Sequence, residues 1–375
     1  MRVVFDATAI PSDRGGVGRY VDALLPALAG LGVQLTVASQ VRDVEAFRLA
    51  VPTAEIVPVP SAAARRAGRL AWEQVELPRL ARRMHADVLH SPHYTMPRWS
   101  PVPVVVTLHD ATFFSHPNVH SAVKRQFFQS RIRAAVRHAA ALVVPSRATG
   151  SEVRRFVGGA QEIFHVAYHG VDTAAFHPVD AAEKARVARS LGVGVDGYVA
   201  FLGTLEPRKN VPALIRAWVS AVSQSAHPPA LVLAGGAGWD ARVDPTVASV
   251  PAGLNVLRPG YLPLADLPGF LGGASVVAYP SLGEGFGLPV LEAMACGSAV
   301  LTTRELSLPE VGGDAVAYSG IDSESISDVL RELLTDRVRR EELSSRAADR
   351  AREFTWERSA RQHVEAYHAA MARGR

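Results

Sequence analysis

Two glutamates, Glu284 and Glu292, stand eight positions apart in a glycine-rich segment, residues 281–297. The segment follows a short apolar run, residues 275–279, that is typical of a buried strand, and Pro289 favours the first turn of a helix. Glycines let a backbone turn tightly and approach a ligand, and a helix start favours an anion. The spacing can place both carboxylates on one wall of a ligand cleft. Alternatively, Glu292 lies on a helix surface and the glycines only form turns.

Arg208 and Lys209 form a second candidate group, shortly after an expected strand that ends at Gly203. Two cations at the mouth of a parallel sheet can neutralise a diphosphate leaving group. A solvated pair at a helix start is the alternative, but cations oppose the helix dipole there unless an anion is present. We therefore predict that this pair binds a diphosphate.

Polar side chains also follow strands in the first half of the chain. His109 follows the apolar run 104–108, where it could bind a donor sugar or an acceptor, with Asp110 orienting it. His93 and Tyr94 end another run and are expected to line an acceptor pocket. Arg19, one turn into the first helix, could reach a phosphate or the acceptor. Each of these side chains has a purely structural role as its alternative.

Short apolar runs alternate with longer amphipathic stretches, which indicates parallel sheets whose strands are buried on both faces. The pattern restarts near Tyr198, so we expect two doubly wound sheets, with a ligand outside the carboxyl ends of the strands. The expected strands are 3–5, 33–38, 87–90, 104–108, 142–145 and 163–166, then 198–203, 230–234, 254–257, 275–279 and 299–302. The tail from about residue 323 is expected to be helical.

The composition of the chain excludes several classes of protein. A chain of 375 residues with 48% hydrophobic residues fits two globular domains. Its one cysteine, Cys296, excludes a disulfide framework or a thiolate zinc site. With no export signal and no apolar run long enough for a bilayer, we expect a cytoplasmic protein.

Charged residues are unevenly distributed along the chain. Residues 1–180 hold 20 Lys and Arg against 14 Asp and Glu. Such a basic half suggests an anionic partner, such as lipid headgroups at the inner face of the plasma membrane or a polyprenyl phosphate, and nucleic acid is not expected. The alternative is that the Arg-rich helices are solvated faces.

The segment 281–297 resembles the Glu-x7-Glu signature of the retaining GT-B glycosyltransferases of sequence family four. Further short segments match that family in order and spacing: residues 15–20, 108–110, 169–172, 203–210 and 308–315. The resemblance implies an α/β fold of two Rossmann-like domains that face a central cleft. Residues 1–177 would bind the acceptor and residues 178–357 the nucleotide sugar, with a C-terminal helix, about 358–375, packing back on the first domain.

The resemblance also implies residue roles. Glu284 would contact the transferred hexose and Glu292 the nucleotide ribose, and the catalytic group would be Glu284, His109, Lys209 and Arg208. Further donor contacts would come from Gly16, Gly203, Thr204, Tyr261, Leu262, Gly285, Phe286, Gly287 and Leu288. The family often has an arginine where this chain has Thr204, so the basic clamp is reduced to two side chains.

We expect no cofactor and no catalytic metal, since no Asp-x-Asp motif follows a strand and two cations can replace a divalent ion. The pattern is most similar to bacterial mannosyl- and rhamnosyltransferases of polysaccharide or glycolipid biosynthesis. GDP-mannose is the first donor expected, then UDP- or dTDP-hexoses, with a lipid-linked, polysaccharide or small-molecule acceptor.

Rival readings remain. A phosphorylase or hydrolysing epimerase on the same fold is the hardest alternative to distinguish from a glycosyltransferase by sequence. A non-enzymatic solute-binding protein would need an export signal. A dinucleotide-dependent oxidoreductase is disfavoured, because Gly15 comes some ten residues after its strand.

Overall fold

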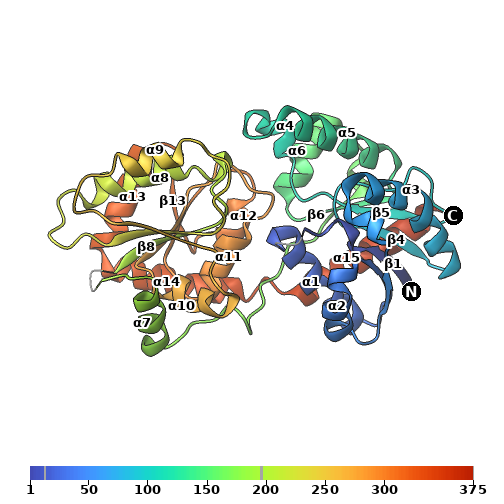
Figure 1. Cartoon of the computed structure of the whole chain (residues 1–375), viewed down its shortest axis with the longest axis horizontal. Helices are drawn as coiled ribbons and strands as arrows, with labels where there is room; N and C mark the ends of the chain where they lie inside the picture. The colour runs from blue at the N-terminus through green and yellow to red at the C-terminus, as the bar shows by residue number, and fades with distance from the viewer. Residues whose placement is uncertain (12–13, 195–196, 375) are drawn as a thin grey trace. The chain divides into compact units, whose positions relative to one another are not determined.

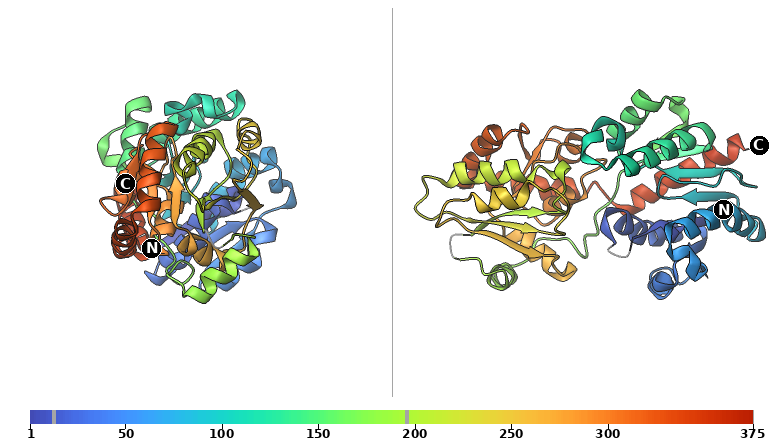
Figure 2. Two further views of the ribbon diagram at one scale, coloured as in Figure 1. Left: turned by 90° about the vertical axis from the view of Figure 1, so that its left-hand side faces the viewer. Right: turned by 45° about the horizontal axis from the view of Figure 1, so that its top comes forward.

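The computed structural model describes residues 1–11, 14–194 and 197–374. The chain forms two compact units, each a parallel sheet between two layers of helices (Figures 1 and 2). Unit 1 comprises Met1–Gly170 and Thr355–Arg375, and unit 2 comprises Val171–Phe354. The first boundary therefore falls at Gly170, not at residue 177. The backbone N–H of Val171 already bonds to the carbonyl of Phe354 in unit 2, at 3.0 Å.

Unit 1 contains a seven-stranded parallel sheet in the order β3-β2-β1-β4-β5-β6-β7. The expected strands are present, and β3 is an addition. Its apolar residues, Ile56 and Val57, are followed directly by Pro58, which disfavours a strand in a sequence pattern. The strands are β1 (Arg2–Asp6), β2 (Gln34–Ser39), β3 (Glu55–Pro58), β4 (Val88–Ser91), β5 (Val104–Thr107), β6 (Ala141–Val144) and β7 (Phe164–Val166).

Unit 2 repeats this plan with six parallel strands in the order β10-β9-β8-β11-β12-β13. The sequence did not predict β13, which is only three residues long. The strands are β8 (Tyr198–Leu202), β9 (Ala230–Ala234), β10 (Val256–Gly260), β11 (Val276–Tyr279), β12 (Val300–Thr303) and β13 (Ala317–Ser319).

Helices cover both faces of each sheet (Figure 1). Unit 1 has α1 (Gly15–Gly30), α2 (Val44–Ala50), α3 (Arg66–Arg83), α4 (Thr112–Ser115), α5 (Ala122–His138), α6 (Arg147–Val157) and the C-terminal α15 (Trp356–Arg373). Unit 2 has α7 (Ala181–Ser190), α8 (Val211–Val222), α9 (Val243–Ala248), α10 (Leu267–Gly273), α11 (Leu288–Ala295), α12 (Leu308–Gly312), α13 (Ser323–Thr335) and α14 (Arg337–Ala351).

Alternate strand residues build the two core layers of unit 1. Val3 and Phe5 point to the layer of α1, α2 and α15, whereas Val4 points to the layer of α3, α5 and α6. This alternation is the two-residue period of a strand that is buried on both faces. The C-terminal helix is thus part of the unit 1 core, and Tyr367 on it is fully buried.

The strand order in each sheet fixes where a site can form. It reverses between β1 and β4 in unit 1 and between β8 and β11 in unit 2. At such a switch point the loops after the two central strands run in opposite directions and leave room for a ligand.

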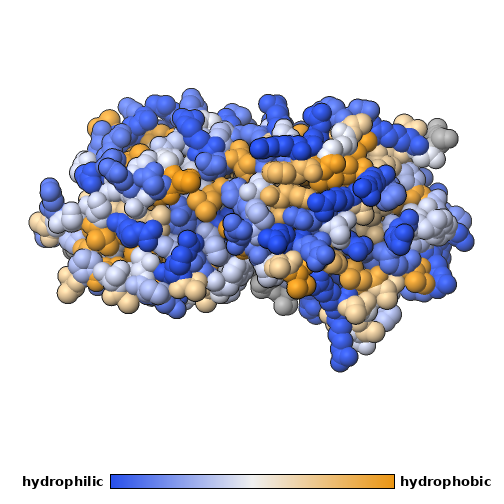
Figure 3. Space-filling model, turned by 90° about the horizontal axis from the view of Figure 1, so that it is seen from above, coloured by the Kyte–Doolittle hydropathy of each residue, from blue (hydrophilic) through white to orange (hydrophobic). Residues whose placement is uncertain are grey.

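The surface shows hydrophobic residues interspersed among hydrophilic ones (Figure 3). Among the described residues, none of the helices combines the length and apolarity needed to cross a bilayer.

Candidate active site

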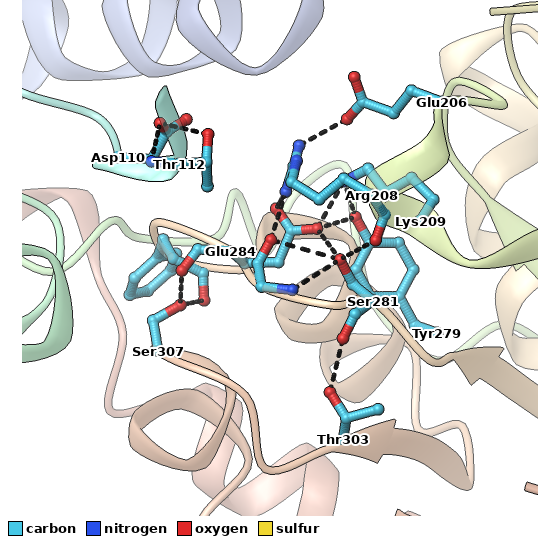
Figure 4. Close-up of polar contacts among 12 residues, drawn as sticks. Asp110, Thr112, Glu206, Arg208, Lys209, Tyr279, Ser281, Glu284, Thr303 and Ser307 are labelled. Carbon is cyan, nitrogen blue, oxygen red and sulfur yellow. Dashed lines mark hydrogen bonds and ion pairs between the residues drawn. The ribbon is translucent and has the colours of Figure 1, made fainter. Parts of the chain in front are cut away.

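The switch point of unit 2 brings together the two segments that the sequence singled out. The loop after β8 carries Arg208 and Lys209 in a short 3-10 helix, η6 (Pro207–Lys209), and the loop after β11 carries Glu284. Because β8 and β11 are paired in parallel, with Val199 opposite Val276, both loops leave the same edge of the sheet. Figure 4 shows the resulting polar cluster.

Glu284 lies at the centre of this cluster and is 7% exposed. Its Oε2 pairs with Arg208 at 2.5 Å, and its Oε1 accepts from the Lys209 ammonium at 2.7 Å. The hydroxyls of Ser281, at 2.7 Å, and Tyr279, at 3.0 Å, also reach Oε1. The carboxylate is therefore fixed by two cations and two hydroxyls.

These contacts decide the ionisation of Glu284. Burial alone would raise the pKa of its carboxyl group, but the charges of Arg208 and Lys209 outweigh burial and lower the pKa to about 2. The same environment lowers the pKa of Lys209, through burial and the neighbouring Arg208 charge, and raises that of Tyr279, through burial and the Glu284 charge. Glu284 is thus an anion and Tyr279 a neutral phenol.

Arg208 and Lys209 already form ion pairs with acidic side chains of the protein. Arg208 donates to the Gly283 carbonyl at 2.7 Å and to Glu206 at 2.6 Å, besides its pair with Glu284. Lys209 also donates to the Tyr279 hydroxyl. A diphosphate bound here would share these donors with the carboxylates.

The loop that carries Glu284 is held by one side chain from β12 and one from the turn that follows β12. The Ser307 hydroxyl lies 2.8 Å from the Glu284 carbonyl oxygen and 2.9 Å from that of Phe286. Thr303 donates to the Ser281 carbonyl at 2.7 Å (Figure 4). The loop backbone is therefore rigidly placed above the end of the sheet.

Gly287 ends this loop and begins α11. Its φ of 103° is a left-handed conformation that glycine adopts without strain. A Cβ atom there would also lie 2.9 Å from Leu308. No side-chain hydrogen bond caps this helix start, but Pro289 has no N–H and the N–H of Val290 bonds to the Gly287 carbonyl at 3.0 Å. Within the first turn, an anion would therefore meet the backbone N–H of Leu288.

Glu292 lies on α11 and is 3% exposed, so it is not a helix-surface residue. Burial, together with the Glu292 charge, raises the pKa of the Cys296 thiol to about 12. The assignment of this carboxylate to the nucleotide ribose stays a prediction.

The other predicted donor residues of unit 2 gather at the same sheet edge. Gly203 directly follows β8, and a Cβ on Gly235, which directly follows β9, would clash with the Gly203 carbonyl at 2.3 Å. Tyr261, after β10, is 67% exposed and lies against Gly236. Thr204 and Leu262 follow Gly203 and Tyr261 directly, and Gly285 and Leu288 flank Phe286 and Gly287.

In unit 1, His109 lies at the end of β5 as expected. Its Nε2 donates to the Pro92 carbonyl at 2.6 Å, which leaves Nδ1 as a hydrogen-bond acceptor. Burial lowers its pKa, so the imidazole is neutral near pH 7. It can therefore accept a proton or a hydrogen bond from a hydroxyl.

The carboxylate of Asp110 is held by the start of α4, and the expectation that it orients His109 stays a prediction. Its Oδ1 accepts from the backbone N–H of Thr112 at 3.0 Å and from the Thr112 hydroxyl at 2.8 Å, which fixes the start of α4. The backbone N–H of Asp110 donates to the buried Tyr94 hydroxyl at 3.0 Å. Asp110 and Tyr94 therefore shape the loop after β5.

Gly16 and Arg19 lie in the first two turns of α1. Gly16 is exposed, and no side chain caps the helix start at Arg14. Arg19 is partly buried and has contacts of its own. Of the two, only the backbone at Gly16 is openly accessible.

Sequence reasoning missed two groups of residues. In unit 2 it missed Tyr279 and Ser281, whose positions at the end of β11 could have suggested them. In unit 1 it missed a buried polar network that joins four elements. Its hydrogen bonds link Tyr20 to Thr107 and His363, and His90 to Thr107 and Tyr367. No local pattern could reveal this network.

Two family models match the chain. Residues 14–175 match Glycosyltransferase Family 4, and residues 189–353 match Glycosyl transferases group 1. The O-antigen chain mannosyltransferase B of Escherichia coli is 29% identical over 98% of this chain and 99% of its own length. A D-inositol 3-phosphate glycosyltransferase of Arthrobacter sp. is 28% identical over 96% of this chain and 91% of its own.

Solved structures share the fold. Alr3699/HepE of Anabaena, solved in complex with UDP-glucose, has a TM-score of 0.77 at 18% identity, with 97% of this chain and 98% of that chain covered. Sucrose-phosphate synthase of Thermosynechococcus elongatus has a TM-score of 0.76 at 19% identity, with 99% of each chain covered. With both domain models matched and this architecture shared, the protein is a family 4 glycosyltransferase with the GT-B fold.

Proposed function

We propose that this glycosyltransferase moves a hexose from a nucleoside diphosphate sugar to an acceptor hydroxyl with retention of anomeric configuration. Unit 2 binds the donor and unit 1 the acceptor. The observation that carries this proposal is the buried Glu284 carboxylate, held ionised by Arg208 and Lys209 at the switch point of unit 2.

The cluster supports a division of roles. An ionised carboxylate only accepts hydrogen bonds, so Glu284 is suited to hold hydroxyls of the transferred hexose. Arg208 and Lys209 stabilise the negative charge that develops on the leaving diphosphate, and the start of α11 adds the backbone N–H of Leu288. Glu292 then binds the ribose, and Tyr261 covers the base.

The electrostatics favour front-face attack over a covalent glycosyl-enzyme. A carboxylate with a pKa of about 2 that is paired with two cations is a weak nucleophile. In the proposed course the acceptor hydroxyl attacks the anomeric carbon on the face that the diphosphate leaves. The departing phosphate oxygen takes the hydroxyl proton, so no enzyme base is required.

GDP-mannose is the donor proposed first, because a mannosyltransferase is similar over the full chain length. UDP- and dTDP-hexoses come next, and a solved structure of the same fold contains UDP-glucose. The acceptor is a sugar on a lipid carrier, a polysaccharide or a small molecule. We further propose that transfer needs no metal, because two cations face the diphosphate position.

The test is a transfer assay with radiolabelled GDP-mannose, UDP-glucose and dTDP-rhamnose. Each donor is incubated with lipid-linked and soluble acceptors, with and without EDTA, and the product anomer is determined by NMR. We expect one donor to give a product that keeps the anomeric configuration of that donor, at a rate that EDTA leaves unchanged. An inverted product, or loss of activity with EDTA, would contradict the mechanism. Turnover that requires inorganic phosphate would identify a phosphorylase instead.

A further inference from the structure

Unit 1 contains a cavity of about 340 Å³ at the end of its sheet. Its walls come from α3, from the first half of α5 and from the loops that follow β1 and β4. These loops lie at the switch point of the sheet, where a ligand is expected. Of the acceptor residues predicted from the sequence, His93 lines this cavity.

Among the described residues, the charged side chains that line the cavity are all cations: Arg66, Arg69 and Lys124. Arg66 lies 4.1 Å from the centre of the Phe127 ring, and no described carboxylate is within ion-pair distance of it. Arg69 pairs with Glu73 at 3.0 Å, and that carboxylate is 1% exposed. The cavity surface is therefore cationic, with an aromatic floor.

A neutral imidazole completes this wall. Burial, followed by the charges of His109, Arg69 and Lys124, lowers the pKa of His93 to about 3. His93 is therefore neutral near pH 7 and offers a hydrogen bond without adding charge. The 17-residue helix α5 also begins at the cavity, so the positive end of its dipole adds to the positive potential of the cavity.

The fold fixes the position of these cations. A Cβ on Gly68 would lie 2.1 Å from the Ala62 carbonyl, so the first turn of α3 packs directly against the 3-10 helix η3 (Ser61–Ala64). The Gln40 amide donates to the Ala63 carbonyl at 2.8 Å and to the Thr8 carbonyl at 3.1 Å. This bridge holds η3 beside the loop after β1.

We propose that this cavity binds a phosphate group on the acceptor, with Arg66, Arg69 and Lys124 as its ligands. The acceptor role rests on the proposed function. A phosphate carries up to two negative charges and three acceptor oxygens, which several separate cations can share. Unit 1 as a whole holds 24 Lys and Arg against 14 Asp and Glu, so its field attracts such a ligand.

Binding is tested first, by calorimetric titration of the full chain with inorganic phosphate. Arg66→Gln and Lys124→Gln are each expected to weaken binding about tenfold. Arg137→Gln is the matched control, because it removes the same charge from the exposed, distal end of α5. Any phosphate that binds to Arg208 and Lys209 in unit 2 binds equally to the wild type and to the three variants, so it does not affect the comparison. Equal affinities in all four would overturn the proposal.

Transfer then identifies the source of the phosphate. The acceptors compared are a soluble hexose phosphate, a hexose on a prenyl diphosphate and the free hexose. One of the two phosphate-bearing acceptors is expected to be the substrate. Lys124→Gln should raise the KM of that acceptor about tenfold and leave the KM of the nucleotide sugar unchanged. Equal KM values for free and phosphorylated hexose would refute the phosphate site while the transferase assignment stands. Phosphate binding that depends on Lys124, without transfer from any donor, would refute the transferase assignment alone.

Discussion

At the residue scale, Glu284 is the side chain on which the proposed chemistry depends. It is buried, ionised and held by four neighbours, so its position is set before a substrate arrives. A preorganised charge of this kind costs no reorganisation during the reaction. The assignment can be tested without changing the size of the side chain.

Glu284→Gln is expected to lower kcat of transfer by about 100-fold or more, because the amide cannot hold the sugar hydroxyls as a carboxylate does. The measurement is steady-state transfer, with circular dichroism to show that the fold persists. Glu332→Gln, on an exposed part of α13, is the control and should match the wild type. A rate within threefold of wild type for Glu284→Gln would remove this residue from the catalytic group.

The same cluster gives a pH prediction. A carboxylate whose folded pKa is depressed keeps its stabilising charge above its unfolded pKa and loses it only as the pH falls through the folded value. With a pKa of about 2, Glu284 stays ionised across the working range. We therefore expect no loss of kcat that titrates near pH 4.5, the ordinary value for Glu. A protonation step near that pH that vanishes in Glu284→Gln would contradict the ion-pair geometry.

At the element scale, the start of α11 places the donor loop. Gly287 combines a left-handed backbone with a tight approach to Leu308, whereas Gly192 has a comparable φ of 71° and open space around it. The two glycines therefore separate the cost of the backbone conformation from the cost of packing. Any additional loss of stability at Gly287 therefore comes from packing in the active-site loop.

Gly192→Ala is expected to destabilise the protein by about 1 kcal/mol, since a left-handed residue with a Cβ is strained. Gly287→Ala should cost more and should also weaken nucleotide binding, because the new methyl group displaces either Leu308 or the loop. Thermal unfolding and nucleotide titration measure the two effects. Equal melting temperatures and unchanged nucleotide affinity in both variants would show that this helix start is not under constraint.

At the scale of the whole molecule, unit 1 contains several histidines that are buried and neutral. His90 and His363 are fully buried, and burial holds the pKa of His90 well below its ordinary value and lowers that of His363 to about 4. The unfolded chain binds protons on these groups near pH 6.5, before the folded chain does. The stability that they contribute is therefore complete above pH 6.5 and is lost as the pH falls.

Unit 1 is accordingly expected to lose about 2 kcal/mol for each of these two imidazoles between pH 7.5 and pH 5.0. Denaturant unfolding at both pH values, followed by near-ultraviolet circular dichroism, measures the change. His363→Gln should flatten the pH dependence even though it lowers stability at pH 7.5, because it removes one titrating group. A free energy of unfolding that does not change between the two pH values would show that these rings are not neutral in the folded state.

The sequence by itself determined the features that are local in the chain. Alternating apolar runs predicted nearly all the strands, because a strand buried on both faces must be apolar throughout. The glycines, Pro289 and the cation pair predicted where the loops after β8 and β11 would bind an anion. Edge strands β3 and β13 were not predicted, because the apolar residues of β3 are interrupted by Pro58 and β13 is only three residues long.

Only the tertiary structure decided the contacts between distant segments. It showed that Arg208 and Lys209 neutralise Glu284, that Asp110 fixes a helix start, and that the C-terminal helix supplies His363 to the core of unit 1. It also gathered Arg66 and Lys124, which lie 58 residues apart, around one cavity. The physical reason is that such contacts depend on how helices pack on the two faces of a sheet, and the local pattern of residues does not specify that packing.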